Sequence, residues 1–287
     1  MLVISGVTGN TGSIVADTLL AQGQAVRVLV RSAEKGLPWK AKGAEVAIAD
    51  IDDLGAVTAA LEGASGAYFL LPPDLTDEAF IDRSRKRAEI LAEAARLARL
   101  PQAVVLSSVG AQYQDRVGPI ATLSYLEDLF IKAGIPLSAV RPGYFFGNLK
   151  EMLPTVLEAG VYPSMVLPLD FKIDMVSAED IGLAVAEALV NPTSEPHRVI
   201  ELKGAARYSA IDVAAAFSKA LGREILPVPV QPETWVDQLT QAGLPGQTAE
   251  AMAEMHENIN NGRIDFVDPN ARKGTVNLDD FVSRLVA

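Results

Sequence analysis

The stretch that decides the fold is Gly6-Val7-Thr8-Gly9-Asn10-Thr11-Gly12. It follows the apolar run Leu2-Val3-Ile4, and from Gly12 onward apolar residues recur at helical spacing. A glycine-rich turn between a strand and a helix brings backbone N–H groups to the helix N-terminus, where they bind phosphate. Gly6 is expected to make the tight turn, and Gly9 to let the backbone pass close to the phosphates. Gly12 is expected to let the helix approach the strand closely. The stretch therefore predicts a dinucleotide site.

Short apolar runs alternate with helical patterns through the first half of the chain. The runs lie at 2–4, 25–30, 45–49, 67–71, 103–106 and 137–140. This alternation predicts an α/β fold, a Rossmann-type doubly wound parallel sheet built from βαβ units. Further helices are predicted at 76–100, 178–190, 209–221 and 233–258.

Prolines interrupt the pattern after about residue 141, and the helices beyond them do not form a repeat. We therefore expect a Rossmann domain at 1–150 and a smaller C-terminal part at 151–287. This second part, α/β and partly interleaved with the first, is expected to cover the substrate.

Composition excludes several classes of function. The 287 residues carry a formal net charge of -11, which disfavours nucleic acid and anionic membranes as partners. Zero cysteines and two histidines leave little with which to bind a metal ion. No apolar run reaches the roughly 20 residues that a membrane span needs, and no basic leader precedes Leu2. We expect a cytoplasmic protein of undetermined oligomeric state.

The end of the second strand indicates which dinucleotide is bound. An acidic residue there hydrogen-bonds the adenine ribose, whereas an arginine meets a 2′-phosphate. Here the strand ends in Val30-Arg31-Ser32, with Lys35 close by and no carboxylate. NADP(H) is therefore favoured over NAD(H). The alternative for Arg31 is an ordinary solvated cation.

Two further strand ends are assigned to the adenine and its ribose. They supply Asp50 and Ile51 after the third strand, and Leu70, Leu71 and Pro72 after the fourth. The carboxyl ends of parallel strands form the edge at which such sheets bind ligands. For Asp50, capping of the following helix is an equal alternative.

Several motifs together resemble the NmrA-like group of atypical short-chain dehydrogenase/reductases. They are the glycine loop, the Arg31 strand end, Leu70-Leu71-Pro72-Pro73, Ser107-Ser108-x-Gly110-Ala111, Arg141-Pro142-Gly143-x-Phe145 and Val176-Ser177-Ala178-Glu179-Asp180-Ile181-Gly182. The likeness spans most of the chain. Within the last motif, Ser177 and Asp180 fit a capping box, so we interpret them as structural.

The chain departs from active extended short-chain dehydrogenases at the Tyr-x-x-x-Lys motif. Counting back from Glu127, which resembles the glutamate of the same helix, the Tyr position falls on Pro119 and the Lys position on Leu123. Neither side chain moves a proton, which argues against alcohol or sugar oxidation.

Members of the NmrA-like group that lack the Tyr-Lys pair are of two kinds, so the resemblance implies two alternative functions for this chain. The first is an NADPH-dependent reductase that transfers hydride to a small aromatic acceptor such as a quinone or azo compound. Hydride addition there yields an anion that water protonates, so orientation and desolvation are the main tasks of the protein. The alternative is a noncatalytic NADP(H)-binding redox sensor. No feature requires a flavin.

Candidate residues for chemistry follow the later strands. Tyr144 and Phe145 are expected against the nicotinamide, Tyr144 being the candidate catalytic residue, and Phe145 and Asn148 are expected to contact the substrate. Ser107, at a strand end, is a further cofactor contact, whereas Tyr113 and His256 are further substrate contacts. Core packing is the alternative for Phe145 and His256.

Overall fold

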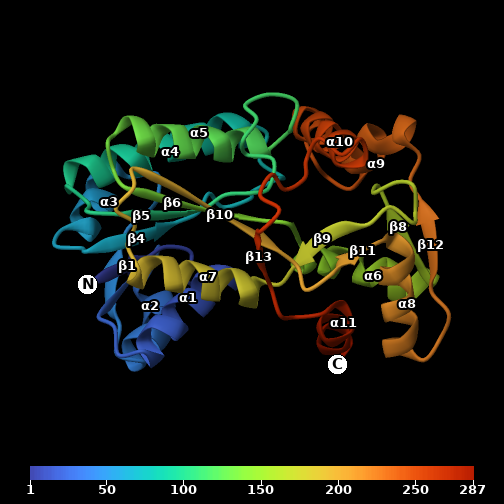
Figure 1. Cartoon of the computed structure of the whole chain (residues 1–287), viewed down its shortest axis with the longest axis horizontal. Coiled ribbons are helices and arrows are strands. Elements are labelled where there is room, and N and C mark those ends of the chain that lie inside the picture. The colour runs from blue at the N-terminus through green and yellow to red at the C-terminus, as the bar shows by residue number, and fades with distance from the viewer.

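One large sheet carries the first half of the chain and part of the second. The computed structural model describes residues 1–287 (Figure 1). The eight strands, in sheet order, are β13 (Arg272–Lys273), β10 (His197–Lys203), β6 (Leu137–Pro142), β5 (Ala103–Leu106), β4 (Gly66–Phe69), β1 (Leu2–Ile4), β2 (Val26–Val30) and β3 (Glu45–Ile48). All neighbouring strands are parallel, which confirms the predicted doubly wound sheet.

Helices cover both faces of this sheet, as Figure 1 shows. On one face lie α1 (Asn10–Ala21), α2 (Ala33–Ala41) and α7 (Ala178–Val190). On the other lie α3 (Leu54–Leu61), α4 (Phe80–Leu97) and α5 (Ile120–Lys132). Two apolar layers, one on each side, bury the sheet, as parallel sheets require.

A second part with its own apolar core follows β6. Its strands are β7 (Tyr144–Phe145), β8 (Val161–Ser164), β9 (Ile173–Val176), β11 (Arg207–Tyr208) and β12 (Leu226–Pro229). Its helices are α6 (Leu149–Ala159), α8 (Ala210–Leu221), α9 (Trp235–Gln241), α10 (Gly246–Asn260) and α11 (Leu278–Val286). The strands form two small sheets, β11-β9-β7 and β12-β8.

The two parts exchange segments along the chain. β10, β13 and α7 all come after residue 150, yet they belong to the large sheet and its covering layer. β10 lies beside β6, with His197 opposite Leu137 and Leu202 opposite Pro142. The large sheet therefore contains strands from both the 1–150 segment and the 151–287 segment, so a boundary at residue 150 divides the sequence but not the sheet.

Two helix predictions differ from the structure. The single helix expected at 233–258 is wrong, because α9 and α10 are separated at Gly243-Leu244-Pro245. Gly243 has a φ of 97°, and a proline cannot supply the N–H that a continuing helix needs. The helix expected from residue 76 begins only at Phe80, since the Asp77 carboxylate accepts the Ala79 N–H and forms a turn first.

A connecting segment at 265–276, here called the strap, joins α10 to α11 and crosses between the two parts (Figure 1). Two buried carboxylates hold its backbone. Glu201 accepts the N–H groups of Val267 at 3.1 Å and Asp268 at 2.7 Å. Asp180 accepts the N–H of Thr275 at 2.8 Å and that of the following residue at 3.2 Å. These bonds fix the strap to β10 and α7.

The predicted capping box at the start of α7 forms only in part, because the Asp180 carboxylate accepts the Ser177 hydroxyl at 2.9 Å rather than the Ser177 N–H. Ser177 caps α7 by accepting the Asp180 N–H at 3.0 Å, as expected. The Asp180 side chain, however, turns to the strap and packs so closely that a Cβ at Gly274 would lie 2.7 Å from its oxygen. The structural interpretation of Ser177 and Asp180 is confirmed, with the strap as an additional partner.

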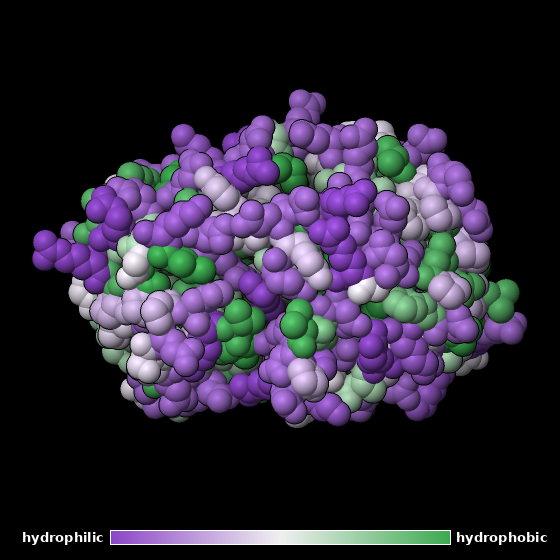
Figure 2. Space-filling model, turned by 45° about the horizontal axis from the view of Figure 1, so that its top comes forward, coloured by the Kyte–Doolittle hydropathy of each residue, from purple (hydrophilic) through white to green (hydrophobic).

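No helix combines the length and apolar composition that crossing a bilayer demands. On the face drawn in Figure 2, hydrophilic residues predominate and hydrophobic ones form small separate groups.

We expect Asp180→Asn to lower the free energy of unfolding by about 2 to 4 kcal/mol, because an amide N–H₂ then faces backbone donors that lose a charged acceptor. Urea unfolding followed by circular dichroism measures this. Glu179→Gln is the control: Glu179 is exposed, its ion pair with Arg284 spans 3.3 Å, and its loss costs below about 1 kcal/mol. Equal effects of the two variants contradict the role of Asp180.

Candidate cofactor and substrate site

The glycine loop between β1 and α1 is closed tightly. Gly6 has a φ of 66°, which favours glycine, and the Gly9 N–H donates to the Gly6 carbonyl at 2.9 Å. A Cβ at Gly12 would lie 2.4 Å from that same carbonyl oxygen, so only glycine allows α1 to approach the loop. The predicted roles of Gly6 and Gly12 as turn and packing residues agree with this geometry.

The N-terminus of α1 offers free backbone donors. Gly9 is its N-cap and has no side-chain hydrogen bond, and Thr8, Gly9 and Asn10 are exposed. Thr11 is different: its hydroxyl lies within 3.1 Å of the buried Tyr68 hydroxyl, so it offers only its backbone. The loop also lies where the strand order reverses, between β1 and β4. Amide donors at such a point fit a pyrophosphate.

Two cations beside this loop have no charged partner. Arg31 and Lys35 are exposed and form no ion pair, while Ser32 caps α2 by accepting the Lys35 N–H. Because neither cation has to give up an ion pair, both are available to an anionic group such as a 2′-phosphate.

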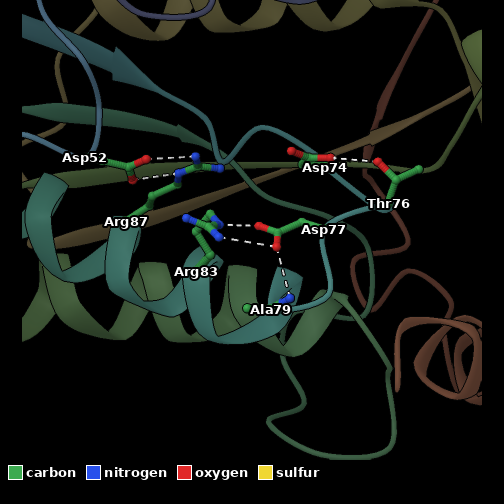
Figure 3. Close-up of polar contacts among 7 residues, drawn as sticks. All are labelled: Asp52, Asp74, Thr76, Asp77, Ala79, Arg83 and Arg87. Atoms are coloured by element: carbon green, nitrogen blue, oxygen red, sulfur yellow. Dashed lines mark hydrogen bonds and ion pairs between the residues drawn. The ribbon is translucent and has the colours of Figure 1, made fainter. Parts of the chain in front are cut away.

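The neighbouring arginines of α4 are occupied, as Figure 3 shows. Arg87 holds Asp52 by two bonds, at 2.8 and 2.9 Å, and Arg83 is paired with Asp77. The pKa of Asp52 lies below its ordinary value, chiefly through the Arg87 bond and more weakly through charges that include Arg31. Arg31 is thus close to this cluster yet remains outside its pairs.

The residues predicted for the adenine lie at the same sheet edge but differ in exposure. Asp50 is exposed, and its carboxylate accepts the Asp52 N–H at 3.0 Å. The helix cap is Asp53, so the alternative that Asp50 caps α3 is wrong. Ile51, Leu71 and Pro72 are partly buried at that edge. Leu70 packs against Gly6, where a Cβ would lie 2.7 Å from its side chain.

A cavity of about 140 Å³ lies next to the carboxyl ends of β5 and β6. Its walls come from the sheet, the second part, α10 and the strap, and they are mostly apolar. The lining residues are Ser108, Val109, Ile120, Gly143, Tyr144, Phe145, Asn148, Phe171, Ile173, Asp174, Arg207, Met255, Ile259, Gly262, Ile264, Asp265 and Phe266. Of the predicted residues, Tyr144, Phe145 and Asn148 meet here.

Two of the predicted substrate contacts, Tyr113 and His256, do not line the cavity. The Tyr113 ring packs against the Arg263 guanidinium, whose Cζ atom lies 4.6 Å from the centre of the ring. His256 is buried, its Nδ1 lies 2.8 Å from the Met252 carbonyl oxygen, and its ring is 6.1 Å from that of Trp235. Burial also lowers the pKa of His256, which keeps the ring neutral. For His256 the structure favours packing over contact with the substrate.

Ser107 belongs to a buried polar group behind the cavity. Its hydroxyl donates to Glu127, and Arg141 donates to the same carboxylate at 2.9 and 2.6 Å. His197 approaches it to 3.5 Å. The Ser107 side chain is therefore engaged with Glu127 and does not line the cavity, whereas its neighbour Ser108 does.

Glu127 remains ionised in this setting. Burial by itself raises the pKa of Glu127, but the nearby His197 ring, hydrogen bonds from Arg141 and Ser107, and the Arg141 charge hold the pKa below its ordinary value of 4.5. A carboxyl group whose pKa is lower in the folded state than in the unfolded state stabilises the fold at every pH above the unfolded-state pKa. This stabilisation is lost as the pH falls through the folded-state pKa.

We expect Glu127→Gln to lower the free energy of unfolding at pH 7 by about 3 to 5 kcal/mol, since Arg141 then stays buried without a counter-charge. The difference from the wild type narrows as pH falls below about 4.5, where the carboxylate of the unfolded chain becomes protonated, and on through the depressed pKa of the folded protein. Urea unfolding at pH 7 and at lower pH measures both. A difference independent of pH contradicts the ionised state of Glu127. Glu89→Gln, at an exposed position, is the control.

Proteins that combine a doubly wound sheet with a glycine loop at its switch point are dinucleotide-binding proteins of the Rossmann class, and the fold and loop place this chain among them. The model of the NmrA-like family matches residues 1–280. The chain belongs to the NmrA-like family, which confirms the resemblance drawn from its motifs.

Relatives with described activities cover most of the chain. It is 28% identical over 257 residues to an NAD(P)H azoreductase of Xenophilus azovorans, which spans 89% of this chain and 86% of the relative. It is 24% identical over 266 residues to quinone oxidoreductase 2 of Escherichia coli strain K12, which spans 92% and 90%. The structure of an Escherichia coli NADPH-dependent quinone oxidoreductase complexed with NADPH superposes with a TM-score of 0.84 at 23% identity, covering 100% of both chains.

Proposed function

We propose that the chain is an NADPH-dependent reductase that transfers hydride to a small aromatic acceptor, a quinone or an azo compound. The observation that carries the proposal is the cavity, whose aromatic walls Tyr144, Phe145, Phe171 and Phe266 adjoin the strand ends that follow the glycine loop. The azoreductase and quinone oxidoreductase relatives support this class of reaction.

The missing proton relay suits such acceptors. Pro119 is the N-cap of α5, and Leu123 lies one turn further on. Since proline and leucine have no ionisable group, neither position can relay a proton. When bound, NADPH supplies the hydride, and water supplies the proton for the anion left on oxygen or nitrogen. The protein then has to orient the acceptor and exclude bulk water, which does not require a Tyr-Lys pair.

Tyr144 is the residue we assign to the acceptor. Burial raises the pKa of its hydroxyl, partly opposed by Asn148, so the phenol stays protonated at neutral pH. A protonated hydroxyl in the cavity wall donates a hydrogen bond to the developing anion, and Asn148 adds a second polar group. Phe145 supplies an apolar wall for the nicotinamide.

A panel of quinones and azo dyes tests the reductase. We expect NADPH to be oxidised only when an acceptor is present, and the loss of NADPH fluorescence measures this. Calorimetry is expected to show that NADPH binds. Tight NADPH binding without oxidation by any member of the panel would falsify the reductase and leave the noncatalytic redox sensor as the function.

Arg31→Asp tests the choice of cofactor. If Arg31 pairs with the 2′-phosphate, its replacement weakens NADPH roughly 10- to 100-fold and NADH by less than about threefold. Calorimetry with both nucleotides measures this. The matched control is Arg85→Asp, an exposed residue of α4 outside the ion pairs, which leaves both affinities nearly unchanged. Equal losses of NADPH and NADH affinity in Arg31→Asp contradict the assignment.

A further inference from the structure

Three charged side chains line a cavity that is otherwise mostly apolar: Asp174 on β9, Arg207 on β11 and Asp265 in the strap. We propose that Asp174 and Asp265 select the acceptor by charge, favouring aromatic compounds that carry a cationic group and rejecting anionic ones. The proposal rests on the proposed reductase function, and it assigns to that function the residues that determine its specificity.

Arg207 is not free to bind an anionic substrate. Its Nε donates to the Lys172 carbonyl at 3.1 Å and lies 3.6 Å from the Asp174 carboxylate. Its Nη2 donates to Asp265 at 3.2 Å. One guanidinium is thus shared by two carboxylates, and the charges that line the cavity sum to one negative (two carboxylates less one guanidinium).

Other cations leave this balance in place. Lys203 is one neighbouring cation, but its ammonium lies 5.5 Å from the centre of the Phe266 ring and 3.4 Å from the Asp268 carbonyl oxygen, and it does not line the cavity. The whole chain carries a net charge of -11, which disfavours the binding of anions in general.

The Asp174 carboxylate gains most from an added cation. Only 8% of its side chain is exposed, although Arg207 remains 44% exposed. Burial raises the pKa of Asp174, and Asp265 acts in the same direction, whereas Arg207, Lys203 and the Gly204 amide oppose them. Its charge is therefore incompletely compensated by the protein, and a cationic ligand in the cavity supplies part of what is missing.

The shape of the cavity brings a ring substituent near these carboxylates. Its volume of about 140 Å³ matches the roughly 150 Å³ that is known to hold one benzene ring. Aromatic walls also attract a cation through the faces of their rings. An acceptor that inserts one ring therefore places a substituent of that ring within a short distance of Asp174 and Asp265.

The test uses three azobenzenes that differ only at one para position: trimethylammonium, tert-butyl, which has the same shape without charge, and sulfonate. Dissociation constants are measured by equilibrium dialysis against the protein saturated with NADP⁺, so that no turnover is needed. We expect the ammonium compound to bind roughly tenfold more tightly than the tert-butyl compound and the sulfonate to bind most weakly.

Asp174→Asn and Asp265→Asn are the test variants, and each is expected to reduce the ammonium preference over tert-butyl severalfold. Asp82→Asn is the matched control, because this substitution removes the same charge as the test variants. Asp82 itself is exposed on α4 and forms no ion pair. Asp265 is 40% exposed, so its variant tests the proposal even if Asp174→Asn unfolds.

Several results overturn the proposal: sulfonate as the tightest ligand of the wild type, an ammonium preference that both variants retain, or no binding of any compound. The reductase is judged separately, by NADPH oxidation with the same three compounds. The expected order of binding without any oxidation refutes the reductase and leaves the charge selection standing.

Discussion

Two buried carboxylates that accept backbone N–H groups are the constraint on which the closed site depends. Glu201 and Asp180 hold the strap against β10 and α7, and a buried charge without such partners is costly. The strap follows α10, so its attachment also fixes the helix that lays Met255 and Ile259 over the cavity. Beyond the strap, α11 packs into the second part, where its Phe281 stacks on Phe146 at 5.1 Å.

The sequence allowed the dinucleotide-binding half to be predicted because its signals are local. Strand, glycine turn and helix follow one another within about twenty residues, and the observed strands lie within two residues of those expected. The cavity gave no such signal. Asp174, Arg207 and Asp265 are ninety-one residues apart from first to last and meet only through β9, β11 and the strap. A carboxylate inside an apolar strand, as in Ile173-Asp174-Met175-Val176, is the one local feature that points to it.

Motif residues that look chemical are partly supports for others. Ser107 and Arg141, both from motifs of the family, meet at Glu127 behind the cavity rather than inside it. Their bonds tie the ends of β5 and β6 to α5, and the residues that follow those ends, Ser108 and Tyr144, face the cavity. Sequence reasoning placed the chemistry at the correct strand ends, yet the side-chain directions depend on a helix that lies between the two strands in sequence.

The distribution of charge gives the two ends of the site opposite characters. At one end, the first turn of α1, Arg31 and Lys35 present donors and cations without partners, and NADPH carries all its negative charge on its phosphates. At the other end, Asp174 and Asp265 outnumber Arg207, so the charges that line the cavity favour a cation over an anion. In the proposed complex, this distribution of charge favours the phosphates of the cofactor at the glycine loop and its uncharged nicotinamide at the cavity. Although the chain carries a net charge of -11, Arg31 and Lys35 give the proposed phosphate site two cations that no carboxylate pairs with.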